Sequence, residues 1–188
     1  MTTAPAETTR TSRRRFLALA GGALLVASGA VAIVRTRGYE VPAGVKLEAL
    51  SAWQYVLVQH LARRIAAPDR DDPTIPTPDD AQVAPFVDSY VARMPEALRR
   101  DLLRAFAFVE HLAPLGAGCA SRFTRLSAAD QDRVLSWLEA NGQDLLRGAF
   151  DGLKSLVFMG YYRDPRTWRI LRYDGPLVGR PEAGWWRP

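Results

Sequence analysis

Apolar residues recur with a helical period along most of the chain after residue 50. The apolar positions of the first stretch are Trp53, Val56, Leu57, Leu61 and Ile65. Spacings of three and four place these side chains on one face of a helix. Ser51 and Gln54 stand at the N-cap and third helical positions of a capping box. The pattern therefore predicts a helix that begins at Ser51 and ends before Pro68.

Residues 68–80 interrupt the helical pattern. They hold four prolines and five aspartates, a composition that excludes a packed helix and predicts a loop. Two further helices are predicted after it. Their apolar positions are Phe86, Val87, Tyr90 and Val91 in the second helix, and Leu98, Leu102, Phe106, Val109 and Leu112 in the third. Pro85 marks a start or a kink in the second helix, and the third ends at Pro114.

Two more helices complete the predicted fold. Ser127 begins the fourth through a Ser-x-x-Asp motif, and Asn141-Gly142 ends it. The fifth covers roughly residues 143–159. No stretch alternates apolar and polar residues for long enough to predict a strand. The predicted fold class is all-α: a single bundle of about five helices, an irregular aromatic-rich C-terminal arm and, before the bundle, a hydrophobic signal or anchor helix.

The apolar segment at the start of the chain lies at residues 16–34 and has no charged member. As a helix it would span roughly 28 Å, close to one hydrocarbon core. The hexapeptide before and into it, Ser12-Arg13-Arg14-Arg15-Phe16-Leu17, resembles the twin-arginine export signal. The matching positions are Ser12, Arg13, Arg14, Phe16 and Leu17. We interpret residues 1–34 as this signal, residues 35–46 as a tether and residues 47–188 as the domain.

The fate of the signal has two readings. Ala30-Val31-Ala32 offers a small-x-small site with cleavage after Ala32. Alternatively, the length of the apolar run and the flanking Arg35 and Arg37 favour a retained membrane anchor.

Charge and cysteine content exclude some classes of partner. The net charge is +5, but residues 1–34 hold four arginines and one glutamate, which leaves 21 basic and 19 acidic groups elsewhere. A balanced domain without a nucleic-acid motif predicts no nucleic-acid partner. The single cysteine, Cys119, is expected to be a small buried hydrophobe, with an intersubunit thiol as the alternative.

Few residues of the sequence are candidates for catalysis or for binding a metal or cofactor. His60 and His111 are the two histidines, and neither has a His or Cys at metal-ligand spacing. We expect a hydrogen-bonded structural role for His60. The aspartate pairs of residues 68–80 are more simply explained as solvated. No phosphate loop, nucleophile elbow or haem-attachment motif is present. The sequence predicts a protein that is not an enzyme and has no catalytic, cofactor-binding or metal-binding residue of its own.

The C-terminal region is rich in aromatics and arginines. Residues 161–188 carry six of the eighteen aromatic residues, which either pack on their own bundle or cover a partner. Arginines recur every three residues, at Arg163, Arg166, Arg169 and Arg172. On an α-helix they would spiral around the axis. This predicts a solvated surface, with an acidic partner surface as the alternative.

Several segments together resemble one known family. They are Leu50-Ser51-Ala52-x-Gln54, Phe86-Val87-Asp88, Leu126-Ser127, Gly160-Tyr161-Tyr162-x-Asp164-Pro165 and Tyr173-x-Gly175-Pro176. Over roughly residues 47–177 the chain resembles the gluconate 2-dehydrogenase subunit 3 family. Two positions depart from the family pattern: Arg163 replaces the usual serine, and the proline–aspartate run at residues 68–80 replaces a glycine-rich loop.

The resemblance implies a small helical subunit that binds no cofactor and accompanies a large FAD-dependent dehydrogenase of the glucose-methanol-choline type. The small subunit would stabilise this partner and carry it through the twin-arginine translocase, with electrons passing on to a cytochrome c subunit. The exported protein would be periplasmic or periplasm-facing and membrane-associated. The partner-binding candidates are Gly160, Tyr161, Tyr162, Asp164, Pro165, Trp168, Tyr173, Gly175 and Pro176. The alternative is a stand-alone exported or anchored helical domain with a binding or structural role.

Overall fold

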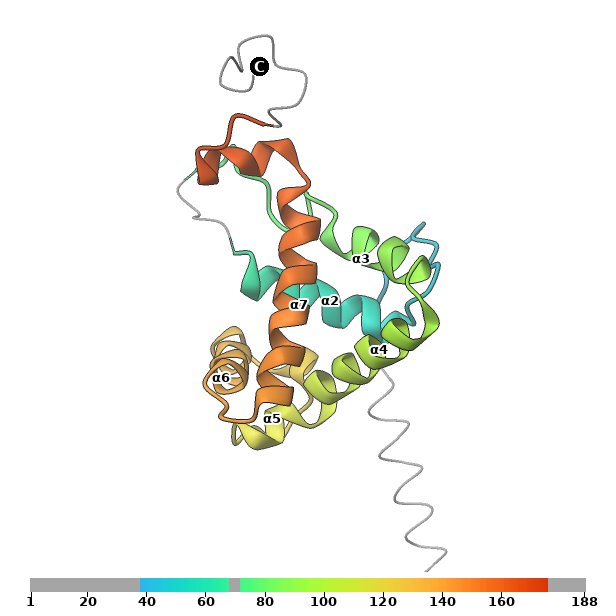
Figure 1. Ribbon diagram of the computed structural model, residues 1–188, viewed down its shortest axis with the longest axis vertical. Helices are drawn as coiled ribbons and strands as arrows, with labels where there is room; N and C mark the ends of the chain where they lie inside the picture. Colours follow the sequence, from blue (N-terminus) through green and yellow to red (C-terminus); the bar gives the residue numbers. More distant parts are fainter. Residues whose placement is uncertain (1–37, 68–71, 176–188) are drawn as a thin grey trace, which may run out of the picture. The chain divides into compact units, whose positions relative to one another are not determined.

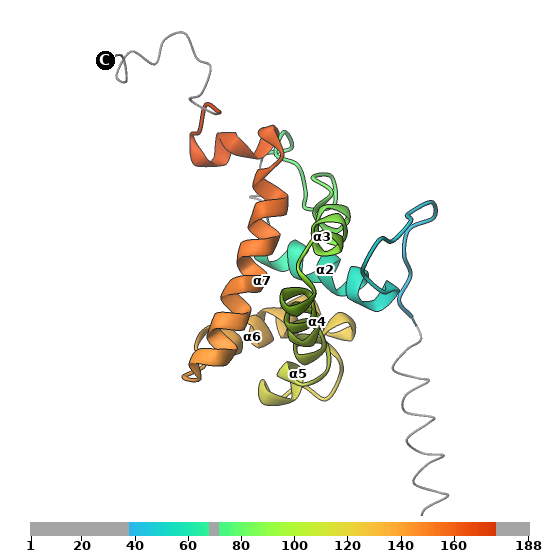
Figure 2. The ribbon, with the colours of Figure 1, turned by 45° about the vertical axis from the view of Figure 1, so that its right-hand side comes forward.

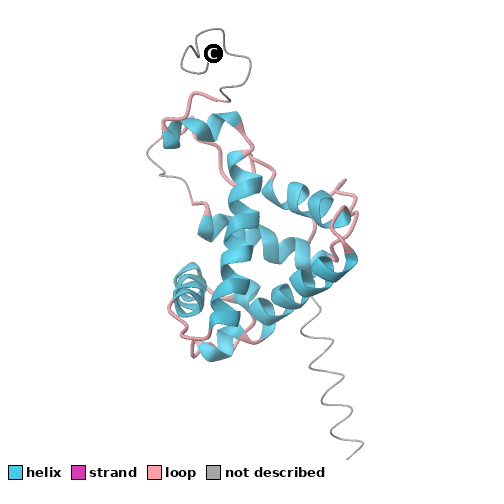
Figure 3. Cartoon of the chain, in the orientation of Figure 1, coloured by secondary structure: helices cyan, strands magenta, loops and turns pink. Residues whose placement is uncertain are grey.

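A computed structural model describes residues 38–67 and 72–175, and this part of the chain is helical without a strand (Figure 3). The α-helices are α2 (Ala52–Ile65), α3 (Val83–Ala92), α4 (Glu96–His111), α5 (Ala113–Gly116), α6 (Ala128–Glu139) and α7 (Asp144–Tyr162). Two 3₁₀ helices are η1 (Phe123–Arg125) and η2 (Pro165–Leu171). The all-α prediction is confirmed for these residues, whereas the predicted signal helix, its cleavage site and Pro176 lie outside them.

Helix α7 is the longest described helix and runs along the body, which we define as residues 39–175 (Figure 1). Helix α2 crosses it, and both helices contact α3, α4 and α6. Figure 2 shows the same crossing from a second direction. The side chains of Leu57, Val58 and Leu61 on α2 are at most 1% exposed. Helix α2 is therefore the centre of the hydrophobic core.

Local capping chemistry sets where two of these helices begin. The backbone N–H of Ser51 donates to Gln54 Oε1 at 2.8 Å, which completes the capping box of α2. Ser127 Oγ accepts from the backbone N–H of Asp130 at the start of α6. Both predicted helix starts are confirmed. Pro85 is the third residue of α3, where a missing backbone N–H costs no intrahelical bond.

The observed helices differ from the predicted ones in three places. The third predicted helix, expected to end at Pro114, is divided into α4, which ends at His111, and the short α5, which includes Pro114. Helix α7 continues through Tyr162, three residues beyond the predicted end, because Tyr161 is buried and holds the last turn against the body. Two of the five periodic apolar positions of the third predicted helix are on the surface: Leu98 is 59% exposed and Leu112 is 56% exposed. The periodicity of α4 therefore marks a stripe that is buried only in its middle.

The compact unit that contains the body begins at Tyr39. Val41 and Val45, within the predicted tether, pack against the hydrophobic core. None of the helices in the described ranges is both long and apolar enough to cross a membrane. The apolar segment at residues 16–34 lies outside these ranges.

Candidate partner interface

The end of α7 is fixed to the body by the Gly-Tyr-Tyr motif. Tyr161 is 2% exposed, and its hydroxyl donates to the carbonyl of Pro76 at 2.9 Å. Gly160 is also buried: a Cβ atom there would lie 2.9 Å from Phe86 Cδ1 and 3.1 Å from Val83 Cγ1. Only glycine lets α7 approach α3 this closely. The structure therefore gives Gly160 and Tyr161, both partner-binding candidates, an internal packing role.

Helix η2 follows as the predicted Asp-Pro start. The Asp164 carboxylate accepts from the backbone N–H of Arg166 at 2.9 Å, and Pro165 is the first helical residue. Thr167 is fully buried, and its hydroxyl donates to the carbonyl of Asp164 at 2.7 Å. Trp168 Nε1 donates to the carbonyl of Tyr162 at 2.8 Å. These bonds fold η2 back onto the end of α7.

The arginines of this region form a face because η2 is a 3₁₀ helix, not an α-helix. Side chains three residues apart are eclipsed at three residues per turn, so Arg166 and Arg169 point the same way. Arg166 Nη2 donates to the carbonyl of Asp80 at 3.2 Å, and Arg169 Nη2 lies 3.9 Å from Asp72 Oδ2. The α-helical spiral does not apply to these two, but both side chains are exposed, so the predicted solvated surface is confirmed for them. The acidic partner of Arg166 is Asp164, 2.6 Å away at the start of η2, and that of Arg169 is Asp72 of the chain's own loop.

Arg163 and the proline–aspartate run, the two positions expected to depart from the family pattern, both make contacts at this end of the body. The Arg163 guanidinium stands over the Phe86 ring, 4.9 Å from its centroid. The described part of the proline–aspartate run, residues 72–80, receives Tyr161, Arg166 and Arg169. Side-chain hydrogen bonds from Thr74 and Thr77 lower the pKa of Asp72 and Asp80. The loop is thus a charged support for η2.

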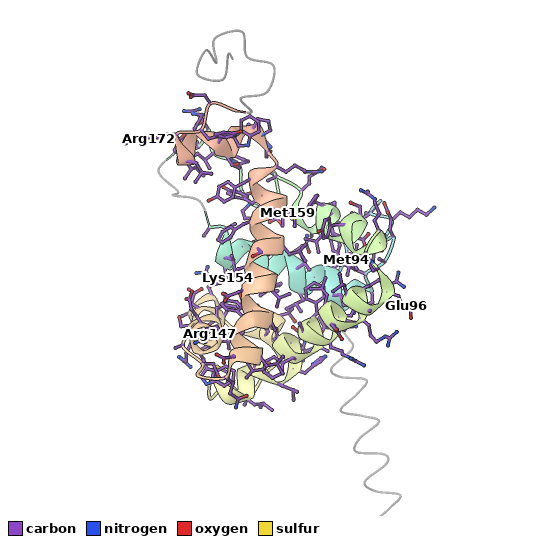
Figure 4. The ribbon with its side chains drawn as sticks, viewed as in Figure 1. Met94, Glu96, Arg147, Lys154, Met159 and Arg172 are labelled. Carbon is purple, nitrogen blue, oxygen red and sulfur yellow. The ribbon has the colours of Figure 1, made fainter. Side chains whose placement is uncertain are left out.

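Exposed large apolar side chains are concentrated at this end of the described chain, beside exposed arginines. Met159, Ile170, Leu171 and Tyr173 are 43–54% exposed, and they make up half of the eight large apolar side chains that are exposed in the described residues. Figure 4 shows Met159 on the half of α7 nearest Arg172, whereas Arg147 marks the other end of the helix. Trp168 and Tyr173 meet edge to face with their ring centroids 5.2 Å apart. We call the four exposed residues Met159, Ile170, Leu171 and Tyr173 the arm surface.

The remaining partner-binding candidates have mixed positions. Tyr162 and Trp168 are half-buried and hold η2 through their hydrogen bond. Asp164 is half-buried, Pro165 is exposed and Gly175 is buried. Tyr173, with 45% exposure, is the most accessible aromatic of the set. The structure therefore brings the motif together in one place, with only part of it facing outward.

The N-terminal family motifs meet through a buried carboxylate. Asp88 on α3 is 4% exposed. Its oxygens accept from the backbone N–H groups of Glu48, Ala49 and Leu50 at 2.7–3.0 Å. The Leu50-Ser51 and Phe86-Val87-Asp88 segments are thus two halves of one structural joint.

A second buried polar cluster was not predicted. Glu110 is fully buried on α4 and accepts hydrogen bonds from the Tyr39 hydroxyl at 2.6 Å and the Thr124 hydroxyl at 2.7 Å. The Arg122 guanidinium lies 3.6 Å from Glu110 and 3.9 Å from the centre of the Tyr39 ring. Burial, followed by the Glu110 hydrogen bond, raises the pKa of Tyr39. A glutamate on the apolar side of α4 was the one sequence signal for it.

The histidine and cysteine assignments agree with the structure. Gln131 Nε2 lies 2.9 Å from His60 Nδ1 and donates to the carbonyl of Phe123 at 3.1 Å. His60 is therefore a hydrogen-bonded structural residue, as predicted. Cys119 is 7% exposed and packs in the core. Within the described residues, no three His, Cys, Asp or Glu side chains are placed to hold a metal ion.

These features define a small helical protein whose recognisable motifs build the body and one aromatic end. A family model described as gluconate 2-dehydrogenase subunit 3 matches residues 52–175. The chain belongs to this family, which confirms the resemblance. The family description is that of a dehydrogenase subunit, which implies an accessory role and a partner dehydrogenase subunit. No curated protein and no solved structure matches the chain.

Proposed function

We propose that this chain is the non-catalytic small subunit of an exported FAD-dependent dehydrogenase of the glucose-methanol-choline type. It binds and stabilises the large subunit, which holds the FAD and oxidises a sugar, a sugar acid or another alcohol. The twin-arginine signal at residues 12–17 then takes the folded pair across the membrane. The complex remains periplasmic or periplasm-facing at the membrane, where a cytochrome c subunit accepts its electrons.

The arm surface is the observation that carries the binding part of this proposal. Tyr173 of the Tyr-x-Gly-Pro segment is exposed, and so are three large apolar side chains close to the C-terminal motif segments in sequence, Met159, Ile170 and Leu171. Tyrosine, methionine and arginine are enriched at protein interfaces, and Tyr173 and Met159 belong to this surface. Arg172, at the end of η2, adds a positive charge to this surface.

Affinity purification of the tagged chain from the exported fraction of its host tests the proposal. We expect a large protein in near-equal amount with the absorption bands of a flavin. Replacement of Arg13 and Arg14 by lysine should remove both proteins from that fraction. A chain recovered alone and colourless would instead favour a stand-alone exported or anchored domain.

Two exposed positions test the arm surface without disturbing its support. Ile170→Asp with Leu171→Asp should reduce the yield of the large protein at least tenfold, because carboxylates would be buried in an apolar contact. Leu98→Asp, at a somewhat more exposed position on α4, is the matched control. Equal recovery with both variants would place the interface elsewhere. Trp168 and Tyr162 are poorer probes because they hold η2 in place.

A further inference from the structure

Helix η2 ends in a turn whose hydrogen bonds fit a Schellman motif. The backbone N–H of Arg172 donates to the carbonyl of Arg169 at 3.1 Å. The next N–H, that of Tyr173, donates to the carbonyl of Trp168 at 3.0 Å. The rings of Trp168 and Tyr173 supply the apolar contact that frequently accompanies this motif. The turn therefore brings Tyr173 of the arm surface back onto η2.

The residue at the centre of this motif adopts the left-handed conformation, which is why glycine usually occupies the position. Here the residue is Arg172, with φ 51° and ψ 38°. Gln82 is the only other non-glycine residue with positive φ in the described ranges. An arginine in this conformation stores strain that a glycine would not. The backbone alone therefore gives no reason for an arginine here.

The Arg172 side chain does not offset this strain by pairing with the body. It is exposed, and no ion pair or side-chain hydrogen bond joins it to another of the described residues. By contrast, Arg163 stands over an aromatic ring, and Arg166 and Arg169 face carboxylates of the chain itself. Figure 4 shows Arg172 at the end of η2 that lies away from α7. Of the four arginines in this series, Arg172 is thus the one whose guanidinium is available to a partner.

The side chains on either side of Arg172 belong to the arm surface. Leu171 is 54% exposed and Tyr173 is 45% exposed. A partner that covered these two side chains would also remove the intervening guanidinium from water. Burial of an unpaired cation is strongly unfavourable, so the partner's surface has to present an anion at this point. The anion that protein side chains offer is a carboxylate, whose two oxygens match two parallel N–H groups of a guanidinium.

We propose that Arg172 is the charged anchor of the arm surface and that its guanidinium pairs with one aspartate or glutamate carboxylate of the partner dehydrogenase subunit. The apolar side chains supply the area of the contact, and the ion pair fixes its orientation. The free chain is thereby less stable than a glycine would make it, and the residue that costs this stability is the one that the partner binds. This inference rests on the proposed function, because it presupposes the partner subunit.

One substitution should then move stability and binding in opposite directions. Arg172→Gly relieves the strain, so thermal unfolding of the full-length chain, purified in detergent, should give a Tm about 2–4 °C above that of the wild type. The same variant lacks the cation. When the complex is immobilised through the tagged chain and washed, we expect its flavin absorbance to decay about tenfold faster than with the wild type, which is the loss typical of a charge-assisted hydrogen bond.

Three further variants separate the charge from the backbone. Gln82→Gly relieves similar strain at the start of α3 and removes no charge, so it should raise Tm and leave the decay rate unchanged. Arg172→Asn lacks the cation but tolerates the left-handed conformation, and its complex should decay as fast as that of Arg172→Gly. Arg172→Lys keeps the charge without the parallel N–H groups, and its decay rate should lie between those of the wild type and Arg172→Gly.

A wild-type decay rate for Arg172→Gly would overturn the inference, and so would an equal acceleration for Gln82→Gly. A lower Tm for Arg172→Gly would show that the arginine stabilises the turn itself, and would also overturn it. These results leave the proposed function standing when Ile170→Asp with Leu171→Asp still lowers the recovery of the flavoprotein. Recovery of no flavoprotein with the wild-type chain would instead reject the proposed function and this inference with it.

Discussion

Two glycines on α7 differ only in what surrounds them, and they should respond oppositely to the same change. In Gly160→Ala, the new methyl group would meet Phe86 and Val83 within 3.1 Å. Overpacking of this kind costs about 1–3 kcal/mol. In Gly152→Ala, nothing lies within 4 Å of the new methyl group, and the better helix propensity of alanine should stabilise the protein by up to about 1 kcal/mol.

Urea denaturation of both variants measures these free energies. A destabilised Gly160→Ala beside a stabilised Gly152→Ala would establish the close contact between α7 and α3. If Gly160→Ala is as stable as the wild type, the two helices do not approach as described.

His60 should make the protein sensitive to mild acid. Burial is the largest cause that lowers its pKa, followed by the charge of Arg63; the Gln131 hydrogen bond and the carboxylates of Glu110 and Asp79 oppose the shift. Below about pH 6.5 the unfolded chain therefore binds a proton on this residue before the folded chain does. The stability that His60 contributes is complete above that pH and is lost as the pH falls towards its lowered pKa.

The measurement is Tm against pH between 7 and 5 for the wild type and for His60→Gln. The wild type should lose more stability across this interval than the variant, which cannot take up the proton. Parallel curves would show that His60 is as easily protonated in the folded chain as in the unfolded one.

At the scale of elements, the start of α2 depends on a residue of α3. Asp88 accepts three backbone hydrogen bonds from residues 48–50. Asp88→Ala leaves these N–H groups without their acceptor and should cost on the order of 3 kcal/mol. Hydrogen exchange at Glu48 to Leu50 should accelerate more than exchange within α6. Exchange that rises uniformly across the body would argue against a local joint.

The elements that the sequence predicts well are those that begin with a local signal. Ser51, Ser127 and Asp164 each bond to a backbone N–H two or three residues away or complete a capping box, so their neighbours suffice to place a helix start. The extra turn of α7 was missed because the acceptor of Tyr161 is Pro76, 85 residues away. The arginine face was missed because the α or 3₁₀ character of η2 depends on its packing.

The candidate site could also be predicted only in part from the sequence. Gly160, Tyr161 and Trp168 could be selected from the sequence as one motif, but not divided into buried and exposed members. Which of these residues are buried depends on the loop at residues 72–80, which precedes α3 and carries no helical pattern. Glu110 illustrates the same limit, because its partners Tyr39 and Thr124 belong to segments outside α4.

For the whole molecule, Tyr39 attaches the first residues of the body to its centre. Tyr39→Phe removes the hydroxyl that donates to the fully buried Glu110 and should destabilise the protein by about 1–3 kcal/mol. Tyr173→Phe, at an exposed position, should change stability by less than about 0.5 kcal/mol. Chemical denaturation of the two variants compares them directly. Equal stabilities would show that the hydrogen bond between Tyr39 and Glu110 does not stabilise the protein.

The position of α7 late in the chain also sets the time at which the body can finish folding during synthesis. The body contains both Tyr39, which donates to the buried Glu110, and the helix that ends at Tyr162, and a ribosome adds roughly 5–20 residues per second. On the order of ten seconds therefore separate the emergence of the two, and the body cannot be complete before the second appears. Under the proposed function, a translocase that accepts only folded proteins would leave the signal at residues 12–17 waiting for that time. Whatever shields this signal in the interval would then determine whether the proposed flavoprotein partner is exported with the chain.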